Sequence, residues 1–319
     1  MIARRIAESF AVAALALAQP ALAATGPCPR VDAYGDFLKL AEASDAPGAF
    51  AEAFLPRYAD LYSREAIGLT PGPALTKRAT AALADGAGLA KGRETEAVLR
   101  RAIPMVTARF AKAFPDFRCS FTIYLAPTFG QMDGAGRQVG GRGGLVLGVD
   151  VIGQLETGPQ LPVFLAHELF HRYHDQAAGF SDDLAARDLI WRTLWAEGLA
   201  TYVSARLNPE RPLADAMLLP RDLEARAAPL VPALAKELSA GLDRADGGLY
   251  RDFFLYDETR AAALGRPARS GYYLGYLVAR KLAERHALAE LPHLKGPALR
   301  AEIGAALAEM AAGNVGPKP

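Results

Sequence analysis

The residues best suited to chemistry lie at positions 167–171, which read HELFH and match the pattern HExxH. On a helix, two residues four apart share one face, with Cβ atoms about 5–6 Å apart. The imidazoles of His167 and His171 can therefore reach one Zn²⁺ at about 2.0–2.1 Å. Glu168 lies about 100° further round the helix, where its carboxylate can take a proton from a metal-activated water. The pattern predicts a hydrolytic site with one zinc ion per chain and Glu168 as general base.

A catalytic zinc site takes three protein ligands and keeps one position open, so the third ligand must come from another segment. The preferred candidate is Glu197, within a stretch at 195–202 that reads WAEGLATY and has helical apolar spacing. Gly198 beside it lacks a side chain, which favours the close approach of a second helix. The competing candidates are three carboxylates between the two segments, Asp182, Asp183 and Asp188.

The remaining histidines are not expected to be ligands. His174 lies seven residues beyond His167, and seven residues of helix rise about 10.5 Å, too far to share one ion. It is interpreted as polar surface or as a residue that supports the ligands. His286 and His293 show no ligand spacing and are expected at the surface, where histidine is usually at least partly exposed.

The overall composition excludes several classes of protein. Lys and Arg number 36 against 35 Asp and Glu, a formal net charge of +1, so a nucleic-acid partner is not expected. Hydrophobic residues make up 51% and charged residues 22%, which favours a folded core over disorder. No apolar run reaches the ~20 residues of a membrane span, so no stable membrane insertion is expected after removal of the N-terminal segment.

The first residues, 1–23, have the pattern of a secretory signal peptide. Two arginines precede a short apolar run at 10–18, and residues 21–23 read ALA, a cleavage site of the A-x-A type. We therefore expect cleavage after Ala23 and a periplasmic or secreted protein.

Export bears on the two cysteines, Cys28 and Cys119. In an oxidising compartment they could form a disulfide. The alternative is two buried thiols, because sequence does not show whether the two Cα atoms approach within bonding range.

Helical spacing of apolar residues dominates 31–117, within the N-terminal region 24–118, and returns from 161 to 312. Between these regions, strands are expected at 121–125 and 145–151. The glycine-rich stretch 130–144 is interpreted as a mobile loop. Strands followed by helices predict an α+β fold, mainly helical with a small β-sheet.

The chain resembles gluzincin-type zinc metallopeptidases, in which HExxH supplies two ligands and a later Glu the third. More narrowly, it is similar to bacterial families of predicted Zn-dependent proteases that carry HExxH, an EGLAxY helix and a late GYxxGY segment, here 167–171, 197–202 and 271–276. The resemblance covers roughly residues 119–285 and implies a zincin-like fold with a substrate strand beside the active-site helix. The expected divisions are a signal peptide, a helical N-terminal region, a zincin-like metallopeptidase domain and a tail, at 1–23, 24–118, 119–312 and 313–319.

Two segments depart from these families. Thr201 stands where thermolysin-like enzymes have an Asp that orients a ligand, which leaves Asp175 as a candidate for that role. Residues 130–134, GQMDG, are faintly similar to the GxMEN motif of zinc aminopeptidases, with Asp133 and Gly134 in place of Glu and Asn. Aminopeptidase activity is therefore a minor alternative.

The oxyanion formed during hydrolysis needs a donor besides the metal. Tyr272 is the preferred candidate, and Tyr273 and Tyr276 are its rivals. The alternative is that these tyrosines only pack, with Gly271 and Gly275 permitting close helix contact.

The sequence therefore predicts an exported zinc metallopeptidase that acts on a peptide or protein substrate. The expected strand at 145–151 could bind an extended peptide by strand addition, or could be an ordinary buried strand. The alternative function is non-catalytic: an envelope binding or structural protein in which zinc stabilises a zincin fold.

Overall fold

The computed structural model describes residues 28–156, 158–179 and 188–314. The expected signal peptide and most of the expected tail lie outside these residues. The sheet has four strands: β1 (Arg30–Asp32), β2 (Thr122–Ala126), β3 (Gly134–Val139) and β4 (Arg142–Gly148).

Helices make up most of the rest of the described chain, which confirms the predicted α+β fold. The helices between β1 and β2 in the chain are α1 (Ala33–Leu40), α2 (Ala46–Ala49), α3 (Leu55–Arg57), α4 (Pro73–Ala84) and α5 (Gly86–Ala113). Those after the sheet are α6 (Val149–Leu155), α7 (Leu161–Ala178), α8 (Ile190–Leu207), α9 (Leu213–Ala216), α10 (Leu223–Ala227), α11 (Val231–Ser239), α12 (Gly247–Phe254), α13 (Glu258–Ala263), α14 (Ser270–Leu282) and α15 (Gly296–Ala311). Short π or 3₁₀ turns are η1 (Phe50–Phe54), η2 (Gly158–Gln160), η3 (Ala228–Leu230) and η4 (Leu291–His293). None of the described helices is both long and apolar enough to cross a membrane.

The strands lie in the order β1-β2-β4-β3. β1 and β4 run parallel to β2, whereas β3 runs antiparallel to β4. The expected strand at 145–151 is thus β4, which begins at Arg142 and ends at Gly148, where α6 follows. Because β2 and β3 occupy both edges of β4, no edge of this strand is free to bind a peptide, and of the two alternatives the ordinary buried strand is the one present. The edges of the sheet are β1 and β3.

β3 lies inside the stretch 130–144, so the interpretation of this stretch as a mobile loop is wrong. The strand could not be predicted from the sequence because its glycines have no side chains, so the alternation of apolar and polar residues that marks a strand is missing. A Cβ on Gly134 would lie 2.8 Å from the side chain of Glu168, and one on Gly136 would lie 2.9 Å from that of Arg172. Glycine is needed in β3 because the strand passes directly against two successive turns of α7.

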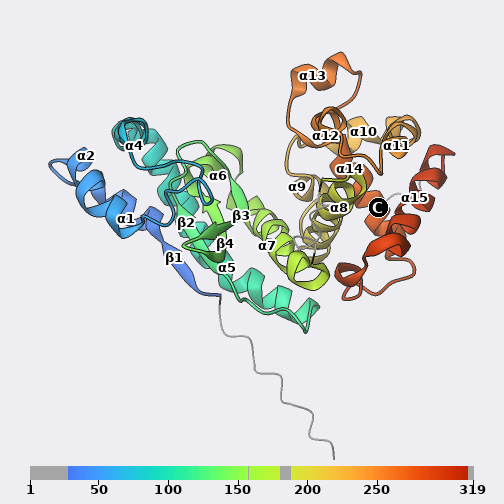
Figure 1. Cartoon of the computed structure of the whole chain (residues 1–319), viewed down its shortest axis with the longest axis horizontal. Coiled ribbons are helices and arrows are strands. Elements are labelled where there is room, and N and C mark those ends of the chain that lie inside the picture. Colours follow the sequence, from blue (N-terminus) through green and yellow to red (C-terminus); the bar gives the residue numbers. More distant parts are fainter. Residues whose placement is uncertain (1–27, 157, 180–187, 315–319) are drawn as a thin grey trace, which may run out of the picture.

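The helix α7 lies between two parts of the molecule. In Figure 1 the sheet and α1–α6 lie on one side and α8–α15 on the other. The buried apolar side chains of both sides form one continuous core, from Phe37 in α1 to Met310 in α15. α7 is therefore held on all sides, and its position is set by the packing of both parts.

The N-terminal region is joined to the rest by a strand and a covalent bond. β1 pairs with β2, with Val31 opposite Tyr124. Cys28 and Cys119 form a disulfide across 91 residues of chain. The pairing that the sequence left open is thus present, and it fixes the start of β1 beside the segment that leads into β2.

Removing this disulfide should destabilise the protein. The double variant Cys28→Ser/Cys119→Ser is expected to lose about 2–4 kcal/mol of unfolding free energy, because the bond restricts the unfolded chain. Denaturant unfolding of the oxidised wild type and the variant measures the difference. The wild type in reducing agent should match the variant, and reducing agent should not change the variant further. A difference below about 1 kcal/mol would contradict the expectation.

Candidate metal centre

Two ligand candidates come from α7, whose ends are well defined. Pro162 lies in its first turn, where a missing N–H has no cost. Gly179 follows the last residue in a left-handed conformation with φ 65°, which ends the helix. The helix is buried nearly all round, so His167 and His171, one turn apart, project from a rigid support.

The third ligand candidate comes from α8, which crosses α14 at two glycines. A Cβ on Gly198 would lie 2.2 Å from the carbonyl carbon of Gly275, and a Cβ on Gly275 would lie 2.5 Å from the carbonyl oxygen of Leu194. The two backbones are therefore in direct contact, as the sequence predicted for Gly198. This crossing brings Glu197 of α8 and Tyr272 of α14 to the same place.

The side chains of His167, His171 and Glu197 meet. The two histidine Nε2 atoms are 3.0 Å apart, and Oε2 of Glu197 lies 3.3 Å from that of His167 and 3.4 Å from that of His171. Among the described residues, these three form the group that could hold a metal ion. Donors on a tetrahedral ion with bonds of about 2.0–2.1 Å stand about 3.3 Å apart. The Nε2 atoms of the two histidines and Oε2 of Glu197 form a triangle with sides of about this length, called the triangle below. Two imidazoles with a carboxylate are a donor set that zinc accepts.

Two buried atoms of this group lack hydrogen-bond partners. These are Oε2 of Glu197, which is one corner of the triangle, and Nδ1 of His167. Buried polar atoms are normally hydrogen-bonded, so an unpaired carboxylate oxygen facing two imidazoles supports the assignment of an ion between them.

At neutral pH two of the three candidate ligands, His167 and Glu197, are in the protonation state that binds a metal. Burial lowers the pKa of His167 to about 4, so its imidazole is neutral. Burial also acts to lower the pKa of His171, but the Glu197 carboxylate outweighs it and raises that pKa to about 9. Its imidazole is therefore protonated at neutral pH and must release that proton to bind a metal. Burial acts to raise the pKa of Glu197, and the two histidines hold it well below its ordinary value. The carboxylate is therefore ionised and can serve as a ligand.

Glu168 lies beside the triangle and is nine-tenths buried. Burial raises the pKa of its carboxyl to about 7, with His171 opposing the shift and Asp133 adding to it. A general base works best with a pKa near the operating pH. The influence of Asp133 and the contact of Glu168 with Gly134 place the segment similar to GxMEN next to the site.

Of the three candidate tyrosines, Tyr272 is the one beside the triangle. Its ring stacks on that of His167, with centroids 6.1 Å apart and planes 20° apart. Tyr273 and Tyr276 stack on each other at 6.4 Å, and the charges nearest to them are those of Glu224 and Arg280. Burial raises the pKa of Tyr272 well above its ordinary value, with Arg269 opposing. Its hydroxyl therefore stays protonated and can donate a hydrogen bond.

The sequence reasoning missed Arg269. Its guanidinium carbon lies 3.8 Å from the centre of the Tyr272 ring, and its charge acts on Glu168 and His167. It belongs to no motif, so only its position three residues before Tyr272 could have drawn attention to it.

The competing carboxylates do not join the group where they are described. Asp182 and Asp183 lie outside the described residues. Asp188 is exposed and is not part of the group of possible ligands.

His174 is buried, so its interpretation as surface is wrong. It is 2% exposed and packs on Phe170 with ring centroids 5.1 Å apart. Burial lowers its pKa to about 3. The reason is that α7 is enclosed on all sides, which the spacing of its polar residues did not indicate. His286 and His293 are partly exposed, as predicted, and pair with Glu302 and Asp116.

Two polar side chains bear on how the ligands could be oriented, Thr201 and Asp175. The Thr201 hydroxyl donates to the backbone carbonyl of Glu197 at 2.8 Å, within its own helix. Asp175 lies 3.8 Å from the guanidinium of Arg172. The role proposed for Asp175 stays a prediction.

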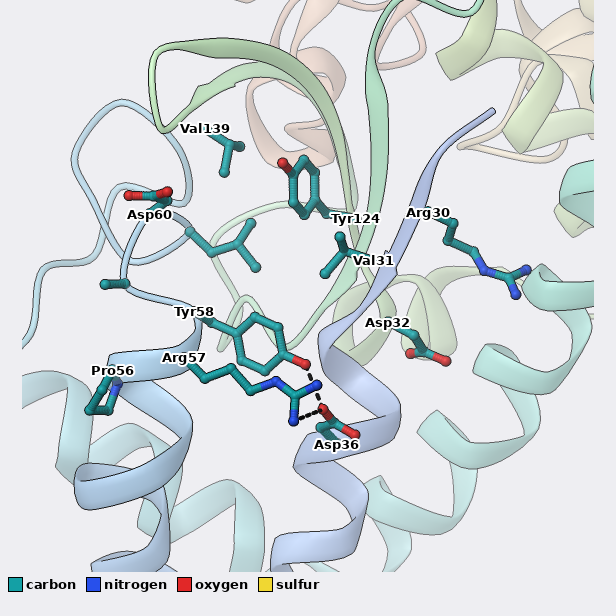
Figure 2. A pocket seen from close by; sticks show the side chains of 12 residues that line it. Arg30, Val31, Asp32, Asp36, Pro56, Arg57, Tyr58, Asp60, Tyr124 and Val139 are labelled. Atoms are coloured by element: carbon teal, nitrogen blue, oxygen red, sulfur yellow. Dashed lines mark hydrogen bonds and ion pairs between the residues drawn. The ribbon is translucent and has the colours of Figure 1, made fainter. Parts of the chain in front are cut away.

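A large pocket lies elsewhere, in the N-terminal part. It has a volume of about 730 Å³, and Figure 2 shows Arg57 and Tyr58 converging on Asp36 inside it. Arg57 lies 3.2 Å from the Asp36 carboxylate, and the Tyr58 hydroxyl donates to it at 2.6 Å. These charges already satisfy one another, and no residue of the triangle lines the pocket. The pocket therefore adds no group to the candidate site.

Comparison with known proteins finds no matching family model, no matching curated protein and no matching solved structure. The function is therefore argued from the site itself.

Proposed function

We propose that this protein is a zinc-dependent metallopeptidase. The observation that carries the proposal is the triangle of donor atoms from His167, His171 and Glu197, with Glu168 beside it. These three residues would hold Zn²⁺. When bound, the ion would polarise a carbonyl group and lower the pKa of a water to about 7.

The other residues of the site have roles that follow from their positions. Glu168 accepts the proton of the attacking water and then transfers it to the leaving amine. A pKa of about 7 suits both steps, since the group can exist in either form at neutral pH. Tyr272, protonated and beside His167, donates a hydrogen bond to the oxyanion.

The edge of the sheet supports a place for an extended peptide beside these groups. β3 is an edge of the sheet and lies against Glu168 through Gly134. Main-chain groups on an edge strand can pair with a peptide by strand addition. We propose β3, in place of the interior strand β4, as the strand that positions the substrate.

The proposal includes export. The disulfide between Cys28 and Cys119 supports an oxidising compartment, because such bonds are rare in the cytosol. The signal peptide itself lies outside the described residues, so the periplasmic or secreted location rests on its sequence and on the disulfide.

A second candidate is a non-catalytic role in which zinc joins helices. The triangle links α7 to α8, and a bound ion would cross-link them. Glu168 supports the first candidate, because a buried carboxylate beside the donor atoms can serve as a general base. Hydrolysis of a peptide that is lost with a chelator and restored by Zn²⁺ would favour the peptidase.

Metal content tests the site directly. We expect elemental analysis of protein purified without chelator to find about one zinc per wild-type chain, and His171→Ala to lose it. His286→Ala is the control, because His286 lies outside the group and should keep the metal. A wild-type protein that takes up no zinc after incubation with excess Zn²⁺ at neutral pH would contradict the proposal.

A further inference from the structure

Arg269 stands beside the site with an unusual backbone. It precedes α14 with φ 58° and ψ 25°, the left-handed region. In the described chain, only two other non-glycine residues, Phe129 and Leu218, have a positive φ. Long side chains are disfavoured there because Cβ approaches a backbone oxygen. Strained residues of this kind cluster where function requires a particular side-chain direction.

Arg269 also lacks an ion-pair partner in the described chain, because its side chain is hydrogen-bonded to that of Tyr272, which is neutral. Among described residues, no carboxylate oxygen lies within 4 Å of its guanidinium, although the side chain is half-buried. Arginines nearby are paired: Arg266 with Glu237, Arg221 with Glu156 and Arg226 with Glu258. A guanidinium does not lose its proton at any ordinary pH, so its charge must be met by another group.

Two carboxylates act on Arg269 without forming an ion pair with it. Glu197 and Asp133 act on Arg269 electrostatically. Glu197 is a corner of the triangle, and Asp133 accepts a hydrogen bond from the backbone N–H of Gly134 at 2.7 Å. The guanidinium of Arg269 therefore lies over the Tyr272 ring, which stacks on the candidate ligand His167. The described chain supplies no anion that pairs with it.

We propose that Arg269 binds a carboxylate of the substrate, so that preferred substrates are peptides with a carboxylate close to the bond that is cleaved. A guanidinium matches a carboxylate with two parallel hydrogen bonds. The carboxylate can belong to the C-terminal residue or to an Asp or Glu side chain. This inference rests on the proposed peptidase function and names its substrate class.

Binding can be measured without hydrolysis. The zinc-loaded Glu168→Gln protein is titrated by calorimetry with acetyl-Ala-Ala, with its C-terminal amide, and with acetyl-Ala-Glu amide. At least one of the two carboxylate probes should bind about ten- to a hundredfold more tightly than the neutral amide, as expected for a hydrogen-bonded ion pair. The probe that does so identifies the source of the carboxylate.

Variants of Arg269 in the same background show whether this residue is responsible. Arg269→Gly should abolish the preference, and Arg269→Lys should keep part of it, since lysine retains the charge without the planar fork. Arg285→Gln removes an exposed arginine outside the site and should keep the full preference. Equal binding of all three probes, or a preference that survives Arg269→Gly, would overturn the proposal.

Arg269→Gly also separates binding from a purely structural role. Glycine adopts positive φ without strain, so the midpoint of thermal unfolding should not fall. A large fall would assign Arg269 to the support of Tyr272 and overturn the proposal. Calorimetry requires no turnover, so the result for Arg269 can be interpreted even if the wild type hydrolyses no peptide. An absence of hydrolysis in the wild type would count against the peptidase function alone.

Discussion

Glu168→Gln is expected to retain about one zinc per chain and to lose peptide hydrolysis by a factor of about 10²–10⁴. The amide has nearly the shape of the carboxylate, and Glu168 is not a corner of the donor triangle, so the metal site should persist. The amide accepts no proton, so water attack and departure of the amine both lose their proton carrier. Initial rates on a peptide mixture, with zinc measured on the same sample, test both parts.

The control for this variant is Glu65→Gln, which changes an exposed carboxylate outside the site. It should keep both zinc and activity. If Glu168→Gln hydrolysed peptides at the wild-type rate, Glu168 would not be the general base. If it lost zinc, the side chain would be holding the metal site together, and the assigned role would also be wrong.

Gly198→Ala is expected to lower the free energy of unfolding by about 3 kcal/mol or more and to weaken zinc binding. The added Cβ would lie 2.2 Å from the backbone of Gly275, and a backbone cannot move aside as a flexible side chain can. α8 and α14 must therefore separate to make room for the added methyl group, and overpacking of a tight contact lowers the free energy of unfolding. Glu197 directly precedes Gly198, so a shift of α8 would also move its carboxylate oxygen out of the triangle.

Denaturant unfolding and a zinc titration measure the two effects together. Gly86→Ala is the matched control, because a Cβ there meets nothing within 4 Å at the start of α5. It should leave stability nearly unchanged and zinc binding intact. Should Gly198→Ala prove as stable as the wild type, the helix crossing would not have the close contact described. Loss of stability with unchanged zinc affinity would show that the crossing does not position Glu197.

Local periodicity was enough to predict part of the site. The helical repeat alone places His167 and His171 on one face of α7, because residues four apart always share a face. The absence of a side chain at Gly198 indicated a close helix contact. The apolar spacing likewise predicted a mainly helical α+β chain with a small sheet. These features depend on neighbours in the sequence, which is why the sequence contains them.

The remaining features depend on how separate elements pack. Only the crossing of α8 with α14 selects Tyr272 over Tyr273, and only the closing of α8 on α7 brings Glu197 to the two histidines. The strand β3 was missed because its glycines fit against α7, an element that comes later in the chain. Burial of His174 and the placement of Arg269 likewise follow from contacts across the fold. A sequence shows which residues share a face of one element, whereas the distances between elements are set by the packing of their surfaces.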